Sequence, residues 1–362
     1  MKTRPRLSLV ALAALLAGLV VSCANPSSPT TATADRSSMI YTCGIGSNGD
    51  YIAALAIDSN TGALKLENSV SEKSLTGGFR SLALSPDGKY LFALDFNKYI
   101  YVYAIDSSTG AITYVSQCPT HDHGMAIRLN AAGSLAFVVT SDGYLESFSV
   151  SGNAVTQVQS LSLSSSGSIM SVAVDSMHGY VYAVHHATDG SGRIYTVAYD
   201  STGALAAATT IITGNAPNYV TVDTTATYLY AAVNDSIYTY TIGSSGALTY
   251  KAKATDSSSC ILCPMSIAFA PSGKYAYAID LFGQVDECTL SDGELAVFGS
   301  AATVANSNPQ SIALDSAGKY VYVADRDTSF IQRFSVSPSD GSLTSTDELL
   351  LDGALMDMAY LR

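Results

Sequence analysis

The chain has 362 residues, a formal net charge of −12 at pH 7 and no tryptophan. This surplus of acidic groups excludes nucleic acid as an expected partner, because its phosphates would be repelled. The same repulsion disfavours direct binding to anionic membrane surfaces, so any membrane contact must come from another feature of the chain.

The N-terminal segment has the pattern of an export signal. Basic residues at Lys2, Arg4 and Arg6 precede a mainly apolar run over 7–21, which is too short and wrongly flanked for a membrane span. The run ends in LVVSC, which resembles the lipobox of bacterial lipoproteins, in which the cysteine becomes the lipid-bearing first residue. We therefore expect a lipoprotein signal peptide over 1–22 and lipidation of Cys23. A plain signal peptide is the alternative.

The next segment has the composition of a linker. Residues 24–38, ANPSSPTTATADRSS, are rich in Ser, Thr, Ala and Pro, so lipidated Cys23 and a flexible tether are expected over 23–38. The mature protein would be a membrane-anchored lipoprotein facing the periplasm or the cell surface. Removal of 1–22 takes away three positive charges and no acid, which changes the formal net charge from −12 to −15.

The cysteine count is odd once Cys23 is set aside. An oxidising compartment favours disulfides, but the five remaining cysteines cannot all pair, so at least one thiol is expected to be free. These residues are Cys43, Cys118, Cys260, Cys263 and Cys288. The CILC segment at 260–263 has redox-motif spacing without a following helix signal, which favours a local disulfide or two free thiols over a thioredoxin-like function.

Self-similarity governs the sequence after residue 38. The segment that begins SLALSPDGKYLFALD at Ser81 returns five times along the chain. Its turn position recurs in steps of 45, 46, 47, 47 and 45 residues, at Gly88, Gly133, Gly179, Ala226, Gly273 and Gly318. A strand-built repeat of this length predicts the blades of a β-propeller.

Each repeat predicts four short strands, a to d. Strand a alternates between apolar and polar residues and is followed by a turn that contains glycine. Strand b has a Tyr-x-Tyr or Tyr-x-Phe pattern that suits a half-buried sheet. Strands c and d are joined by turns such as DSSTGA at 106–111, DSTGA at 200–204 and SPSDGS at 337–342. Their recurrence at one position without regular acidic spacing favours hairpin turns over calcium loops.

The two ends of the chain complement each other. The first unit, from Met39 to about Ser74, supplies strands b, c and d, and the C-terminal LMDMAYL at 355–361 has the pattern of strand a. Joining them completes a blade and leaves no open sheet edge. The predicted fold over 39–362 is therefore all-β, a seven-bladed β-propeller of four-stranded antiparallel blades, closed by the C-terminal strand that completes the first blade.

The blade motifs carry a family resemblance. The Trp-Asp signature of WD40 repeats is absent, whereas LSPDGKYLFALD at 84–95 and DSAGKYVYVADRDTSFIQRFSVSPSDGSLT at 315–344 resemble lactonase-type seven-bladed propellers. That family includes bacterial 6-phosphogluconolactonases and the fungal carboxymuconate cycloisomerase, and YVTN-repeat surface propellers are related to it. These motifs build blades, so they specify fold and family better than activity.

The d-to-a and b-to-c connections of a propeller emerge on one face, around the mouth of the central channel, and here they hold most of the unusual residues. Four of the five histidines fall on this mouth face, and only His178 falls on the other. We expect a small-molecule or protein ligand there. The residues assigned to binding are Asp95, His185, His186, Asn218, Asn234, Asp280, Gln310 and Asp327.

The segment HDHG at 121–124 leaves three interpretations open. On an extended chain the rings of His121 and His123 would point the same way and could share a metal with His185 or His186. Solvated or hydrogen-bonded loop histidines are the second possibility, and half of a catalytic pair is the third. His-x-His alone is a weak metal signal, so we predict no metal and no cofactor.

The family resemblance implies a catalytic arrangement. THDHGMAIRLNAAG at 120–133 is similar to the His-Pro-His stretch that opens a blade in lactonase-like propellers, and relatives often carry an Asn-Arg pair where this chain has Arg326. It implies that His121 or His123 acts as general base on a water. Arg80 or Arg326 would then stabilise the oxyanion formed from a lactone carbonyl.

The chain also departs from the family. The family tends to carry Asp-Leu-Gly-x-Asp where this chain has VVTSDGYLESF at 138–148, and an acid partner for the base is not evident. An Asp- and Asn-rich mouth and export both disfavour a sugar phosphate. We therefore expect a monomeric, lipid-anchored, extracytoplasmic module that binds a ligand or protein at a diverged site. A hydrolase that opens a non-phosphorylated lactone is the alternative.

Overall fold

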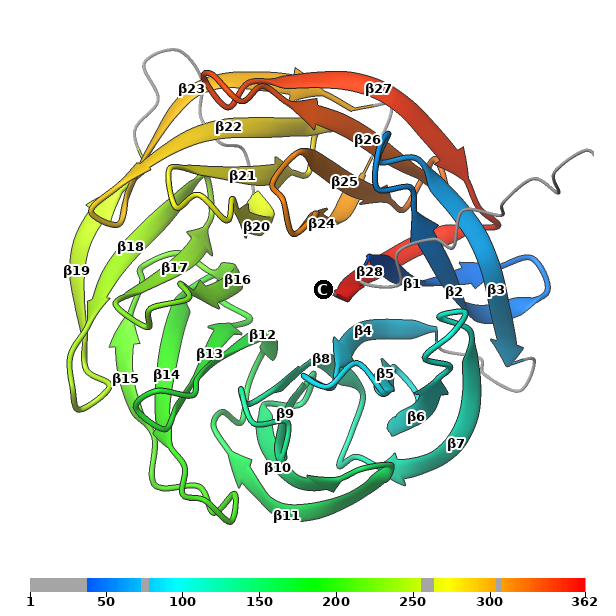
Figure 1. Cartoon of the computed structure of the whole chain (residues 1–362). Helices are drawn as coiled ribbons and strands as arrows, with labels where there is room; N and C mark the ends of the chain where they lie inside the picture. Colours follow the sequence, from blue (N-terminus) through cyan, green and yellow to red (C-terminus); the bar gives the residue numbers. More distant parts are fainter. Residues whose placement is uncertain (1–37, 73–77, 255–263, 304–307, 362) are drawn as a thin grey trace, which may run out of the picture. The chain divides into compact units, whose positions relative to one another are not determined.

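The chain folds into a ring of seven four-stranded sheets around a central opening (Figure 1). The computed structural model describes residues 38–72, 78–254, 264–303 and 308–361, all within one compact unit over 34–362. The expected signal peptide, Cys23 and the tether lie outside the described residues. The predicted all-β fold of seven antiparallel blades is confirmed. No helix that could cross a membrane occurs in the part of the chain that the structure describes.

Each blade runs outward from the axis in the order a, b, c, d. The innermost strands a are β4 (Phe79–Leu84), β8 (Gly124–Leu129), β12 (Ser168–Asp175), β16 (Pro217–Val222), β20 (Pro264–Phe269), β24 (Pro309–Leu314) and β28 (Ala354–Leu361). The strands b are β1 (Met39–Gly46), β5 (Tyr90–Asp95), β9 (Leu135–Thr140), β13 (Tyr180–His186), β17 (Tyr228–Val233), β21 (Tyr275–Asp280) and β25 (Tyr320–Asp325).

The outer two strands of each blade follow the same order. The strands c are β2 (Gly49–Ile57), β6 (Tyr99–Ile105), β10 (Tyr144–Ser151), β14 (Gly192–Ala198), β18 (Ser236–Ile242), β22 (Gln284–Ser291) and β26 (Phe330–Val336). The outermost strands d are β3 (Leu64–Glu72), β7 (Ile112–Pro119), β11 (Ala154–Ser162), β15 (Thr209–Ile212), β19 (Leu248–Lys253), β23 (Glu294–Ala302) and β27 (Leu343–Leu350).

The ring closes through the C-terminal strand, as the sequence predicts. β28 pairs antiparallel with β1, so the closing blade has the order β28-β1-β2-β3 (Figure 1). The carboxylate of Asp357 in β28 accepts hydrogen bonds at 3.0 Å from the Ser81 hydroxyl on one side and the Ser311 hydroxyl on the other. One side chain thus joins the two blades that flank the closing blade.

The repeated tyrosines and turn glycines contact each other between neighbouring blades. Tyr277 donates its hydroxyl to the carbonyl of Gly341 at 2.8 Å, and Tyr322 does the same to Gly62. The first tyrosine of the same pair, Tyr275, lies so close to Gly341 that a Cβ there would be 2.6 Å from its ring. The Tyr-x-Tyr strands and the c-to-d turns therefore hold neighbouring blades together, and we call these contacts the inter-blade latch.

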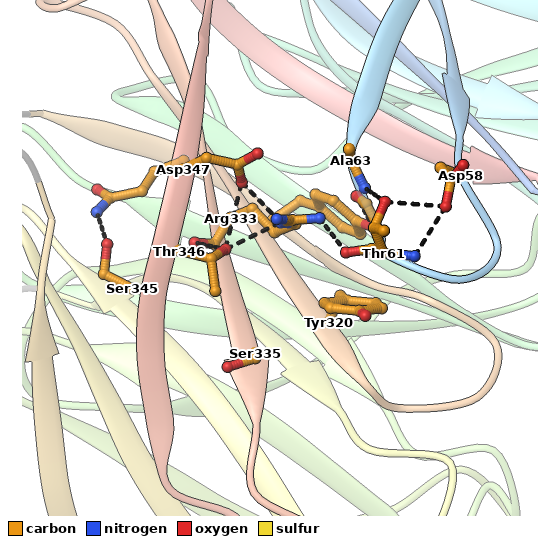
Figure 2. Close-up of polar contacts among 12 residues, drawn as sticks. Asp58, Thr61, Ala63, Tyr320, Arg333, Ser335, Ser345, Thr346 and Asp347 are labelled. Carbon is orange, nitrogen blue, oxygen red and sulfur yellow. Dashed lines mark hydrogen bonds and ion pairs between the residues drawn. The ribbon is translucent and has the colours of Figure 1, made fainter.

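Figure 2 shows this latch where the last internal blade meets the closing blade. Arg333 forms an ion pair with Asp347 at 2.6 Å, lies 5.3 Å from the ring centre of Tyr320 and donates to the carbonyl of Thr61. Asp58 accepts the Thr61 N–H at 2.8 Å and holds the turn. The Asp-Ser-Gly segments are thus hairpin turns, as expected from the sequence.

The apolar core lies in layers between adjacent blades. One such layer contains Phe92, Leu94, Ile100, Val102, Ile127, Ala136, Val138 and Phe148, drawn from two neighbouring sheets. The innermost strands border the axis of the ring, and side chains on these strands that the layers do not use line the central opening. Those axial side chains make the candidate site.

Candidate functional site

A cavity of about 390 Å³ lies at the axis, between the innermost strands. Every innermost strand contributes one residue at the same position near its start: Arg80, Met125, Met170, Asn218, Met265, Gln310 and Met356. At each of these positions the pairing with the neighbouring strand b skips a residue. A bulge of this kind turns one side chain out of the ladder. We call these seven residues the bulge ring.

The bulge ring corrects the sequence assignment of three predicted residues. Arg80, Asn218 and Gln310 were expected in d-to-a connections, but they lie within β4, β16 and β24. The strands begin earlier because the residue before each bulge already pairs with the end of strand b, as Pro309 does with Asp325. All three residues line the cavity.

A layer of serines below the bulge ring forms hydrogen bonds between neighbouring strands of the cavity wall. The Ser81 hydroxyl accepts the N–H of Ile127 in the next blade at 3.4 Å, and the Ser311 hydroxyl accepts the N–H of Met358 at 3.1 Å. Arg128 also lines the cavity and donates to the Ser81 hydroxyl at 3.1 Å. These bonds link β4 to β8 and β24 to β28, so part of the cavity wall is held by hydrogen bonds between adjacent innermost strands.

Arg80 lines this cavity, and a second arginine, Arg326, directly follows β25 on the mouth face. Burial lowers the pKa of Arg80, and the positive charge of Arg326 lowers it further, which places the two guanidinium groups within electrostatic range of each other. Arg80 lies 5.0 Å from the ring centre of Phe96, and neither arginine forms an ion pair with a described residue. Two neighbouring cations without a carboxylate partner form a site suited to an anion.

The two histidines of HDHG lie outside the described lining of the cavity and contact different neighbours. His121 stacks on Tyr144 with ring centres 4.1 Å apart, and its Nδ1 lies 3.1 Å from Asp142. His123 packs on Phe96, in the preceding blade, with ring centres 4.5 Å apart.

The backbone explains why the two rings separate. The Thr120 hydroxyl donates to the carbonyl of Asp122 at 2.9 Å and closes a bend, so the extended chain assumed for shared metal binding does not form. His185 is 1% exposed and its Nε2 lies 2.5 Å from the Ser166 carbonyl, whereas His186 is exposed. The described residues contain no group of three His, Cys, Asp or Glu side chains that could hold a metal ion.

The predicted binding aspartates at the ends of strands b serve the connections that follow them. Asp95 accepts the Tyr99 N–H at 2.7 Å, and Asp280 accepts the N–H groups of Phe282 and Gln284 at 2.9 and 2.8 Å. Burial raises the pKa of both carboxyls, that of Asp95 to about 6. Neither side chain is among the described lining of the cavity.

The remaining predicted residues lie on the mouth face but not in the cavity wall. Asn234 is exposed in the β17–β18 turn with a φ of 50°, and Asp327 is exposed in the β25–β26 turn beside Arg326. Of the site residues predicted from the sequence, Arg80, Asn218 and Gln310 are the ones among the described residues that line the cavity.

Sequence reasoning missed the methionines of the wall, Arg128 and Asp357. Five of the chain's eight methionines line the cavity: Met125, Met170, Met265, Met356 and Met358. The signal that would have found four of the seven bulge-ring residues is a Ser-apolar-Ala sequence in strand a, at 81–83, 171–173, 266–268 and 311–313, which each of the four immediately precedes. Among the described residues, Cys43 and Cys118 are buried free thiols, in agreement with the expectation of at least one free thiol. The CILC segment lies outside the described residues.

Comparison with known proteins agrees with this architecture. The fold is similar to that of a candidate 6-phosphogluconolactonase from Bacteroides fragilis NCTC 9343, which is 19% identical, with 93% of this chain and 100% of that chain covered and a TM-score of 0.78. It is also similar to the periplasmic gluconolactonase PpgL of Pseudomonas aeruginosa, at 16% identity, 90% and 99% coverage and a TM-score of 0.78. None of the curated proteins compared with the chain matches it.

At these identities the solved structures establish the fold alone. The family assignment comes from the sequence, because the model of the family described as "Lactonase, 7-bladed beta-propeller" matches residues 95–355, which is most of the chain. The chain therefore belongs to the lactonase family of seven-bladed β-propellers.

Proposed function

We propose that this propeller binds a small molecule through a carboxylate at the mouth of its central cavity. The observation that carries the proposal is the Arg80 guanidinium, which lines the cavity without an ion-pair partner among the described residues and lies within electrostatic range of Arg326. Bringing two like charges together costs free energy, and an anionic ligand between them offsets that cost. Asn218, whose side chain makes no hydrogen bond with a described residue, supplies a further polar group in the wall.

The cavity favours binding over catalysis because its wall offers no available base. The described lining contains no histidine, and its one carboxylate, Asp357, already accepts hydrogen bonds from two hydroxyls and two backbone N–H groups. A carboxylate engaged by four donors must give up a hydrogen bond before it can serve a substrate. A single carboxylate is also a better match than a phosphate dianion, since buried aspartates surround the mouth.

Calorimetric titration of the purified full chain tests this proposal. The probes are acetate, hexanoate, benzoate and gluconate, each compared with its neutral amide. Arg80→Gln and Arg326→Gln should each weaken carboxylate binding about 10- to 100-fold, since a charge-assisted hydrogen bond contributes about 1.5–3 kcal/mol. Arg193→Gln, at an exposed arginine outside the described lining, is the matched control. Equal binding of acids and amides, or no binding of any acid, would overturn the proposal.

Hydrolysis of a non-phosphorylated lactone is the second candidate, favoured by the family and by one contact. Phe96 touches both the Arg80 guanidinium and the His123 ring, so a substrate at Arg80 lies one ring away from a histidine. A pH-stat assay with aldonolactones and simple γ- and δ-lactones tests it. Turnover that disappears in His123→Gln and persists in His178→Gln would establish a lactonase with His123 as the base.

We further propose that the chain is exported and anchored by a lipid on Cys23, with no direct protein contact to the membrane. The basic N-terminus, the apolar run and LVVSC support this. So does the similar fold of a P. aeruginosa protein that is named as periplasmic. Cys23→Ser should move the protein from the membrane fraction to the soluble fraction. Retention of this variant in the membrane fraction would contradict the anchor.

A further inference from the structure

We infer that the ligand of the cavity is an amphipathic acid, with a carboxylate at Arg80 and Arg326 and an apolar body that crosses the channel. This inference rests on the proposed function and deepens it. It concerns the part of the ligand that the arginines do not touch, and it comes from the composition of the rest of the cavity wall.

The wall around the arginines is built largely from thioethers. Four of the seven bulge-ring residues are methionines, and Met358 and Ile312 line the cavity below them. Methionine side chains are apolar, flexible and polarisable, so they adapt to the shape of an apolar group and offer nothing to a row of hydroxyls. A sugar acid would leave several of its hydroxyls facing these methyl and sulfur atoms without partners.

Much of the polar lining is already engaged within the protein. The Ser81 and Ser311 hydroxyls donate to Asp357, and the Gln310 amide donates to Asn308 at 2.7 Å. Arg128 donates to the Ser81 hydroxyl and to the carbonyl of Ile127. Groups that are satisfied internally must give up a hydrogen bond to serve a ligand, so they select weakly for a polyhydroxylated body.

The methionines lie on both sides of Arg80, on β8 and β28, as well as across the ring from it, and the apolar surface continues to the rim. Arg80 belongs to β4 and Met265 to β20, and these two strands lie on opposite sides of the central opening in Figure 1. Above Met265, in the β21–β22 connection, Leu281 lines the cavity at 40% exposure and its neighbour Phe282 is 63% exposed. Apolar side chains this exposed beside a cavity mark a surface that a ligand can cover.

A chain-length series separates this inference from the proposal beneath it. Acetate, butanoate, hexanoate and octanoate carry the same carboxylate, and gluconate matches hexanoate in carbon number. Affinity should rise about two- to fourfold for each added methylene until the cavity is filled, and hexanoate should bind at least tenfold more tightly than gluconate.

Isosteric variants then locate the apolar contact. Met265→Gln and Met170→Gln keep the length of the side chain and add a polar amide, so each should weaken octanoate binding about three- to tenfold and leave acetate binding unchanged. Met177→Gln is the matched control, because Met177 is 68% exposed in the turn between β12 and β13, on the other face. Its octanoate affinity should equal that of the unaltered chain.

The outcomes distinguish the two claims. Affinity that is independent of chain length, or Arg80-dependent binding of gluconate that exceeds that of hexanoate, would overturn the amphipathic ligand and leave the carboxylate site intact. Absence of binding by every acid would overturn both. Chain-length dependence that survives both methionine substitutions would place the apolar body elsewhere and would also overturn the inference.

Discussion

At the bulge of β4, Arg80 leaves the strand ladder and rests on the ring of Phe96, with Arg326 as its charged neighbour. Three buried carboxylates on the mouth face that could have competed for these cations are committed to the backbone. Asp95, Asp280 and Asp325 accept the N–H groups of the connections that follow them. The acidic residues therefore fix the shape of the mouth, and the arginines supply its recognition chemistry.

Asp95 provides a pH-dependent test at the level of one residue. Burial raises the pKa of this carboxyl from 3.8 to about 6, so the folded state holds its proton more tightly than the unfolded state does. Ionisation of Asp95 therefore destabilises the folded state. This destabilisation is nearly absent at pH 4, grows as the pH rises toward 6 and is complete above pH 6. Asp95→Asn should raise the free energy of unfolding at pH 7.5 by about 1–2 kcal/mol, with little change at pH 4.

Urea unfolding at the two pH values measures this effect. Asp327→Asn is the matched control, because that side chain is exposed in the equivalent turn of another blade and should leave stability unchanged at both pH values. An Asp95→Asn variant that is less stable at pH 7.5 than at pH 4, relative to the unaltered chain, would contradict the assignment.

At the scale of elements, the inter-blade latch makes a prediction about two glycines with the same backbone conformation. Gly341 has a φ of +77° and faces the ring of Tyr275, whereas Gly273 has a φ of +66° and no atom within 4 Å of the point that a Cβ would occupy. Gly341→Ala should cost about 2–4 kcal/mol, from backbone strain and the displaced ring. Gly273→Ala should cost only the strain, about 1 kcal/mol.

Thermal and urea unfolding of the two variants separates the contributions. The chain already carries Ala226, with a φ of +52°, at the turn position equivalent to Gly273, which indicates that an alanine is tolerated there. Equal destabilisation by the two substitutions would mean that Tyr275 does not hold the turn, and the latch would then be wrong.

The blades could be predicted from the sequence because their signals are local and repeated. The Tyr-x-Tyr strands, the turn glycines and the Asp-Ser-Gly turns each carry enough information within a few residues to set strand and turn. The site could not be predicted as well, because a bulge changes which residue of strand a faces the axis, and a one-residue shift moves a side chain to the other face. His121 and His123 lie in the predicted connection, but the sequence could not show that the Thr120 hydroxyl bends the segment and separates the two rings.

At the scale of the whole molecule, the ring depends on a contact between segments at opposite ends of the chain. Asp357 accepts hydrogen bonds from Ser81, from Ser311 and from the N–H of Leu82. Asp357→Ala leaves these donors unpaired, which should lower the free energy of unfolding by about 2–4 kcal/mol. Asp347→Ala, which removes an outer ion pair with Arg333, should cost about 1 kcal/mol or less.

Chemical denaturation followed by tyrosine fluorescence checks this comparison. Both variants remove one carboxylate, so a general effect of charge would appear in both alike. If Asp347→Ala proved the more damaging of the two, the ring would be held mainly by its outer latches and Asp357 would not be the residue that joins the flanking blades.

The most direct test of the carboxylate site is a crystal structure of the full chain with bound hexanoate. We expect the carboxylate to lie within hydrogen-bond distance, about 2.7–3.1 Å, of the Arg80 or Arg326 guanidinium, and the hydrocarbon chain to be directed toward Met170 and Met265. A ligand bound outside the central cavity, or a carboxylate held by Arg128 instead of the mouth arginines, would contradict it.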